Sequence, residues 1–119
     1  MGASQDGERA FGVTLERADG RCVVVVRGEV DMDTAEDLGR VVECVRRSGA
    51  PLVIDLAHTT FMDSSGINLL LRAHAACGGH PDAVTLRAPS DAVLTTLTLA
   101  GVTALLRIES AGTAAPPPG

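Results

Sequence analysis

The chain contains no Trp, no Tyr and no Lys, and it has only two Phe among its 119 residues. A core without large aromatic side chains must be built from Val, Leu, Ile and Ala, which suits a largely parallel sheet covered by helices. Nucleic-acid-binding proteins need basic side chains for the phosphates and often aromatic rings for the bases. The acidic balance, a net charge of −5, and the near absence of aromatic residues therefore argue against nucleic acid as a direct partner.

Long apolar runs are missing too: no run approaches the roughly 18 residues of a membrane-spanning helix, and no basic-flanked apolar segment opens the chain. We therefore expect a cytoplasmic protein without a membrane partner.

The three cysteines, Cys22, Cys44 and Cys77, are widely spaced, form no CxxC pair and have no His at zinc spacing. Free thiols, no metal site and no cofactor are the expectation.

The length is that of one domain. We expect a flexible N-terminal segment at residues 1–10, the folded domain at residues 11–110, and a disordered Pro-rich tail, "AGTAAPPPG", at residues 111–119.

The first half of the domain predicts a hairpin, a helix and a strand. Alternation at Val13 and Leu15, a turn at Asp19-Gly20 and a run from Val23 to Val26 indicate the hairpin. Asp33 is the predicted N-cap of a helix, and Glu36 three residues later resembles a capping box. Apolar residues recur there at helical spacing, and Gly49 and Pro51 end the helix. The segment Leu52–Leu56 predicts a buried strand.

The second half repeats the alternation of helix and strand. Ile67, Leu70 and Leu71 mark a helix that ends at Gly78-Gly79, and residues 83–88 predict a strand. A third helix, capped by Pro89-Ser90, ends at Gly101, and residues 104–108 predict the last strand. We therefore expect a single α/β domain, with a mainly parallel mixed sheet of about five strands, one antiparallel edge and helices packed against it.

Acidic residues at strand ends suggest one function, that of a phosphate-accepting receiver domain. Asp55 ends a buried strand, and Asp31 and Asp33 follow another. A receiver also needs a Lys after a late strand, and this chain has none. Its acidic pair should follow the first strand, whereas these acids follow a hairpin.

A serine hydrolase is a second possibility, since Ser64 and Ser65 lie near histidines in the sequence. A nucleophilic Ser needs a His to accept its proton and a third group to orient that His. No G-x-S-x-G motif is present, and His74 lies about 15 Å along the same predicted helix at 1.5 Å per residue. His58 remains a geometrically allowed partner, but nothing specifies a reaction.

The segment Asp63–Gly66 has two interpretations. Asp and Ser are ordinary helix caps, so the segment is explained by capping alone. However, it leaves the carboxyl end of a central strand, where open α/β sheets place their ligands. It also begins a helix, whose free N–H groups accommodate an added phosphate.

Three motifs together resemble the STAS domain of bacterial anti-sigma factor antagonists. They are G-E-V-D at Gly28–Asp31, F-M-D-S-S-G at Phe61–Gly66, and a Pro-Ser cap followed by a helix and a glycine between Ala88 and Gly101. The resemblance extends from about Gly12 to Glu109.

The resemblance implies partner switching and no enzymatic activity. In this family the first serine of the D-S-S-G loop, here Ser64, is phosphorylated by a serine kinase that is also the anti-sigma factor. The unphosphorylated antagonist binds that kinase and frees a sigma factor, and a PP2C-type phosphatase restores the phosphorylated form. Asp31, Asp63, Ser65, Gly66 and Asn68 are the implied partner-binding residues, with Ser65 starting the helix.

One residue departs from the family pattern, because Asn68 stands where the family commonly has a small residue, often Gly. A different interpretation keeps the STAS fold and changes its use, to a scaffold, a transporter-associated module or a small-ligand-binding module without a sigma-factor role. The intact Ser64 favours the switch, since a purely structural module would not need it.

Overall fold

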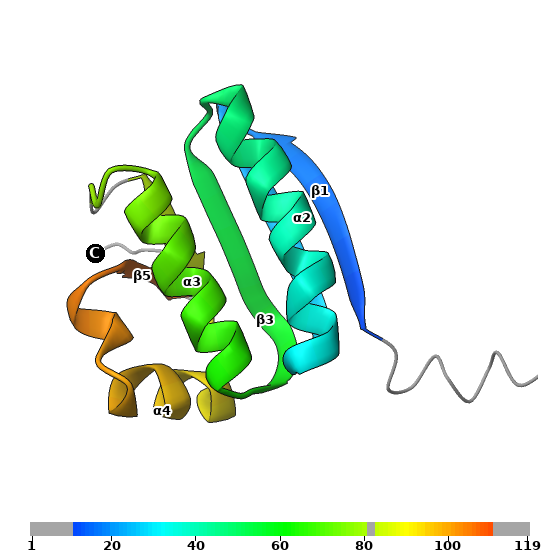
Figure 1. Ribbon diagram of the computed structural model, residues 1–119, viewed down its shortest axis with the longest axis vertical. Coiled ribbons are helices and arrows are strands. Elements are labelled where there is room, and N and C mark those ends of the chain that lie inside the picture. Colours follow the sequence, from blue (N-terminus) through cyan, green and yellow to red (C-terminus); the bar gives the residue numbers. More distant parts are fainter. Residues whose placement is uncertain (1–10, 81–82, 111–119) are drawn as a thin grey trace, which may run out of the picture.

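A computed structural model of the chain describes residues 11–80 and 83–110 (Figure 1). The segments expected at residues 1–10 and 111–119 lie outside the described residues. The elements are, in order, β1 (Gly12–Ala18), β2 (Arg21–Val30), α2 (Met32–Ser48), β3 (Leu52–Met62), α3 (Ser64–Ala76), β4 (Val84–Arg87), α4 (Asp91–Leu99), the 3-10 helix η1 (Val102–Ala104) and β5 (Arg107–Glu109).

The five strands form one sheet in the order β1-β2-β3-β4-β5. Only β1 and β2 pair antiparallel, and every later pair is parallel, which confirms the predicted mainly parallel sheet with an antiparallel edge. Asp19 and Gly20 both have positive φ, 54° and 77°, as the hairpin turn between β1 and β2 requires. Helices α2 and α3 lie side by side over the sheet (Figure 1).

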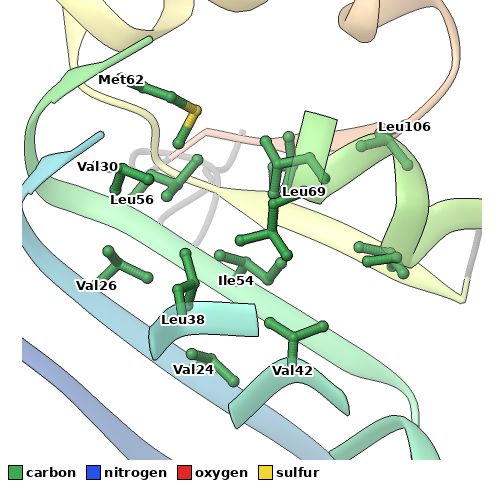
Figure 2. Close-up of a cluster of buried hydrophobic side chains, with 14 of the residues drawn as sticks. Val24, Val26, Val30, Leu38, Val42, Ile54, Leu56, Met62, Leu69 and Leu106 are labelled. Carbon is green, nitrogen blue, oxygen red and sulfur yellow. The ribbon is translucent and has the colours of Figure 1, made fainter. Parts of the chain in front are cut away.

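The core lies between those two helices and the sheet. Figure 2 shows Leu38 and Val42 of α2 close to Val24 of β2 and Ile54 of β3. Val23, Val25 and Val53 form a second, smaller buried cluster. Because alternate residues of a strand point to opposite faces, β2 is buried on both of its faces, which explains its unbroken run of valines.

Strand β3 is longer than predicted, since it continues from Leu52 to Met62 and not only to Leu56. Two register shifts between β2 and β3 interrupt the pattern on which the prediction was based. Polar side chains complete the hydrogen bonding there: the Thr59 hydroxyl donates to the Val26 carbonyl at 2.9 Å, and the Ala57 N–H donates to the Asp55 carboxylate at 2.9 Å. The polar sequence after Leu56 is therefore part of the strand and not a loop.

The predicted last strand, residues 104–108, was wrong in its first half. Gly101 has φ of 81°, and the chain after it forms η1. The amide groups of Leu105 and Leu106 donate to the Val102 carbonyl, so they are unavailable to a sheet ladder. Only Arg107–Glu109 pair with β4, which itself ends at Arg87.

Among the residues that the structure describes, no helix is long and apolar enough to cross a membrane.

Candidate functional site

The carboxyl ends of β2 and β3 bring two of the three sequence motifs together. Val30, at the end of β2, pairs with Met62, at the end of β3, and the Asp63 N–H donates to the Val30 carbonyl at 3.1 Å. Helices α2 and α3 begin immediately after these strands. The motifs at Gly28–Asp31 and Phe61–Gly66 therefore meet at one edge of the sheet, which we call the carboxyl edge.

Asp31 begins α2, so the predicted N-cap at Asp33 was wrong by two residues. The Asp31 carboxylate accepts from the Asp33 and Thr34 N–H groups at 3.0 and 3.1 Å, and the Thr34 hydroxyl accepts from the Asp31 N–H at 2.8 Å. This reciprocal arrangement is a capping box. The Thr34 N–H, which favours the charged carboxylate, is the main cause that lowers the pKa of Asp31 below 3.8.

Asp63 begins α3 in a simpler way. Its carboxylate accepts from the Ser65 N–H at 2.8 Å, and its carbonyl accepts from the N–H groups of Gly66 and Ile67, both at 3.1 Å. The first helical residue is thus Ser64, not Ser65, which contributes its backbone N–H to the cap. Asp63 alone caps the helix, and neither serine hydroxyl takes part in the cap.

The hydroxyl of Ser64 is available. Its side chain is exposed, Ser65 is half-buried, and neither hydroxyl has a hydrogen-bond partner within residues 11–80 and 83–110. Asn68 is exposed four residues beyond Ser64, which places it on the same face of α3. An anion at Ser64 would lie at the positive end of the α3 dipole.

Gly66 fixes how closely α3 approaches the sheet. A Cβ atom at this position would lie 2.5 Å from Cγ of Met62 and 2.9 Å from Cγ1 of Val30. Both neighbours are buried core residues at the ends of β2 and β3. The absence of a side chain at Gly66 therefore lets the first turn of α3 rest directly on the paired strands, and this contact sets the position of Ser64.

Gly28 has a different reason to be glycine. Its φ is 88°, a conformation that residues with a side chain rarely adopt, and it lies at one of the two register shifts between β2 and β3. The glycine at the start of the first motif thus allows β2 to turn toward the carboxyl edge.

Asp55, the residue that suggested a receiver, is held in an ion pair. Its carboxylate accepts from Nε and a terminal nitrogen of Arg87, at 3.2 and 3.0 Å. A phosphate acceptor would need that carboxylate free. The pairing ties β3 to β4 and offers a structural role for Asp55.

The histidines lie far from Ser64 along the chain. His58 precedes Asp63 by five residues of β3, about 16 Å of extended strand at about 3.3 Å per residue. His74 follows Ser64 by ten residues of α3, about 15 Å of helix. Neither separation brings that imidazole within hydrogen-bond reach of the Ser64 hydroxyl, so neither His58 nor His74 is placed to act as its base.

Ser90 has a role that the sequence did not reveal. It was predicted to cap α4, and it does occupy the N-cap position, but its side chain makes no capping bond. Instead its hydroxyl donates to the Thr59 carbonyl at 2.6 Å. This bond ties the start of α4 to β3, and Figure 1 shows α4 beside the carboxyl end of that strand. The third motif therefore reaches the same edge as the other two.

A surface hollow lies elsewhere, between α2 and α3, and it is lined by Gly39, Val42, Leu69, Ala73 and their neighbours. None of the predicted site residues lines it. Within the described part of the chain, no group of three or more His, Cys, Asp or Glu is placed to hold a metal ion.

A family model described as Mlab, STAS domain, matches residues 13–107 of the chain. Among solved structures, an anti-sigma factor antagonist from Mycobacterium paratuberculosis is similar, with a TM-score of 0.77 and 28% identity over 85% of this chain and 86% of that one.

Two structures of SpoIIAA share the fold. The unphosphorylated form of this anti-sigma factor antagonist has a TM-score of 0.69 and 20% identity, over 87% of this chain and 92% of that one. The phosphorylated form, described as a Bacillus cell fate determinant, has a TM-score of 0.64 and 21% identity, over 87% and 96%. With the family model covering most of the sequence and the same fold in these neighbours, the chain belongs to the STAS-domain family.

Proposed function

We propose that this protein is an anti-sigma factor antagonist whose binding is switched by phosphorylation of Ser64. Unphosphorylated, it binds an anti-sigma factor that is also a serine kinase, and a sigma factor is released. Phosphorylated, it leaves the kinase until a PP2C-type phosphatase removes the phosphate. In this scheme the protein is a substrate and a binding partner in the cytoplasm of a bacterium, and it catalyses no reaction.

The observation that carries the proposal is the position of Ser64. Its side chain is exposed in the first turn of α3, directly after a central strand, and its hydroxyl makes no bond to the described residues. A kinase can therefore reach this hydroxyl without unfolding the helix. The cap contacts of Asp63 use the Ser65 N–H and not the Ser64 side chain, so they survive modification of Ser64.

The similar structures support the same function. The relative from Mycobacterium paratuberculosis is an anti-sigma factor antagonist, and SpoIIAA has been solved in both phosphorylated and unphosphorylated forms. Phosphorylation adds about −1.5 to −2 charges at neutral pH. At Ser64 this charge would stand beside Asp63, at the edge where Asp31 also lies.

The test begins with affinity capture by Ser64→Ala, which should hold the kinase in a complex that phosphorylation cannot dissolve. The captured kinase, once purified, is then incubated with ATP and the wild-type protein. We expect one phosphate per chain, located at Ser64 by tandem mass spectrometry. Ser64→Asp should bind the kinase at least ten-fold more weakly than wild type.

Ser65→Ala is the matched control, because it removes the neighbouring hydroxyl and keeps the backbone N–H that Asp63 uses. It should still be phosphorylated at Ser64. Phosphate on Ser65 or elsewhere, or continued modification of Ser64→Ala, would contradict the site assignment.

A second candidate is a STAS scaffold, transporter-associated module or small-ligand binder without a sigma-factor role. The observation that favours this candidate is the matching family model, which is described as Mlab, STAS domain. It predicts that Ser64→Ala and Ser64→Asp bind the same partner as tightly as wild type. The two candidates are therefore separated by one pair of variants.

A further inference from the structure

The carboxyl edge carries two exposed apolar side chains beside the proposed phosphorylation site. Met32 is 75% exposed and directly follows the Asp31 cap, while Phe61 is 47% exposed two residues before the Asp63 cap. The Val30–Met62 pair joins the two strand ends, so Met32 and Phe61 come from neighbouring elements. Phe61 is also one of only two Phe in the sequence.

The same edge is strongly acidic. The segments that lead to it and away from it, residues 28–38, 59–71 and 88–99, contain seven acidic residues and no Arg, Lys or His. The rest of the sequence holds eight acidic residues and ten Arg, a net charge of +2. The acidic excess of the chain therefore lies in the segments that meet at the carboxyl edge.

We propose that Met32 and Phe61 are the apolar anchors of the kinase-binding surface, and that the surrounding acids steer a partner whose docking face is basic around an apolar centre. This inference rests on the proposed function and specifies its partner. Buried aromatic and Met side chains at the centre of an interface, with charges at its rim, match the usual anatomy of protein–protein contacts. Complementary charge at the rim mainly raises the association rate.

A basic docking face on the partner affects how phosphorylation can release the antagonist from the kinase. A phosphate on Ser64 adds negative charge, which a basic face would attract at long range, so net repulsion does not release the antagonist. When the partner covers Met32 and Phe61, however, the exposed Ser64 side chain at the same edge would be taken out of water. Burying a phosphate dianion there without compensating partners carries a large desolvation cost. Phosphorylation should therefore act on dissociation and leave the electrostatic attraction in place.

The experiment uses the purified kinase that modifies Ser64 and surface plasmon resonance at 50 and 300 mM NaCl. Met32→Ala and Phe61→Ala should each raise Kd about ten-fold or more, mainly through faster dissociation. Leu15→Ala is the control, since Leu15 is 51% exposed on β1, away from the carboxyl edge, and should change Kd less than two-fold. Wild-type association should slow several-fold at the higher salt concentration.

Phosphorylated protein should associate at a rate within about three-fold of wild type at low salt and dissociate at least ten-fold faster. Thermal unfolding of Met32→Ala and Phe61→Ala confirms that they remain folded. If a kinase that modifies Ser64 binds both variants as tightly as wild type, or associates independently of salt, the inference is wrong and the proposed function stands. If no kinase modifies Ser64, the proposed function fails, and this inference fails with it.

Discussion

The two helices that begin at the carboxyl edge start in different ways. At α2, the Asp31 carboxylate accepts hydrogen bonds from two backbone N–H groups, and the Thr34 hydroxyl accepts one from the Asp31 N–H. At α3, the Asp63 carboxylate accepts from the Ser65 N–H alone. The first helical residue is the apolar Met32 in one case and the exposed Ser64 in the other.

This difference suggests that the two neighbouring caps have different roles. The start of α2 is closed by side-chain contacts, so it holds the edge in place. At the start of α3 the N–H groups of Ser65, Gly66 and Ile67 are bonded to Asp63, and the exposed Ser64 hydroxyl is the group left available. The proposed phosphorylation of Ser64 requires an accessible hydroxyl, and the capping box of α2 would keep the neighbouring surface in place when the phosphate is added.

The largest effect is expected from closing the space under α3. Gly66→Ala places a methyl group against Met62 and Val30, which should lower the free energy of unfolding by about 1–3 kcal/mol. Gly39→Ala in α2 is the matched control, because its Cβ would lie an acceptable 3.4 Å from the flexible end of Leu69. That variant should gain about 0.5 kcal/mol from helix propensity. Urea titrations of both variants and of wild type measure the change in the free energy of unfolding. A change in the same direction for both variants would refute the packing argument.

Removing each cap tests the comparison directly. Asp31→Ala should cost about 1–2 kcal/mol, and Asp63→Ala about 0.5–1 kcal/mol, because Asp31 satisfies more N–H groups and anchors the capping box. Equilibrium unfolding in urea gives both numbers under one set of conditions. A larger loss for Asp63→Ala than for Asp31→Ala would mean that α3 has the firmer start.

Acid should weaken the α2 start. Since the pKa of Asp31 is lowered from 3.8, its stabilisation is complete above pH 3.8 and is lost as pH falls through the lower folded-state pKa. Glu43 titrates in the same range, because the hydrogen bond from Arg46 lowers its pKa to about 2. Glu43 contributes equally to wild type and to Asp31→Asn, so its contribution cancels when the free energies of unfolding of the two proteins are subtracted. This difference should shrink between pH 5 and pH 2.5, and a constant difference would contradict the role of the charged cap.

The smallest effect on stability is expected at Ser64 itself. Ser64→Asp puts a negative charge at the amino end of α3, where the helix dipole favours it, while Asp63 nearby opposes it. The two influences should leave the free energy of unfolding within about 0.5 kcal/mol of wild type. Calorimetric Tm values for the variant and wild type provide the check. A loss above about 2 kcal/mol would show that the α3 start is not open to modification.

The sequence predicted the order of elements well and their ends less well. Valine runs and helical spacing identify β2, α2 and α3, because burial alone decides those patterns. The choice between Asp31 and Asp33 as the cap depends on where β2 stops pairing with β3, which local sequence does not contain. Similarly, residues 57–60, which include His58 and two threonines, belong to a strand because they lie along β2, where the Thr59 hydroxyl donates to the Val26 carbonyl.

The structure shows where the predicted site residues lie, while their roles in phosphorylation and partner binding stay predictions. The motifs identified Asp31, Asp63, Ser65, Gly66 and Asn68 beside Ser64, and the structure gathers the first four at the edge with Asn68 one turn along α3. The starting residue of α3 and the bond from Ser90 to Thr59 were not foreseen. The bond from Ser90 joins segments 31 residues apart in the sequence, which no local pattern reveals.

Because of the two register shifts, the length of β3 determines which side chains face the core and which lie at the carboxyl edge. Between the pairs Val25–Asp55 and Val30–Met62, β2 advances by five residues and β3 by seven. Because side chains alternate between faces, deleting Thr60 would turn Met62 outward and Asp63 toward the core. A single-residue insertion or deletion in this stretch would therefore displace the carboxyl edge and Ser64 together. The spacing from Asp55 to Ser64 is thus a feature to compare in other STAS sequences when the proposed phosphorylation of Ser64 is tested.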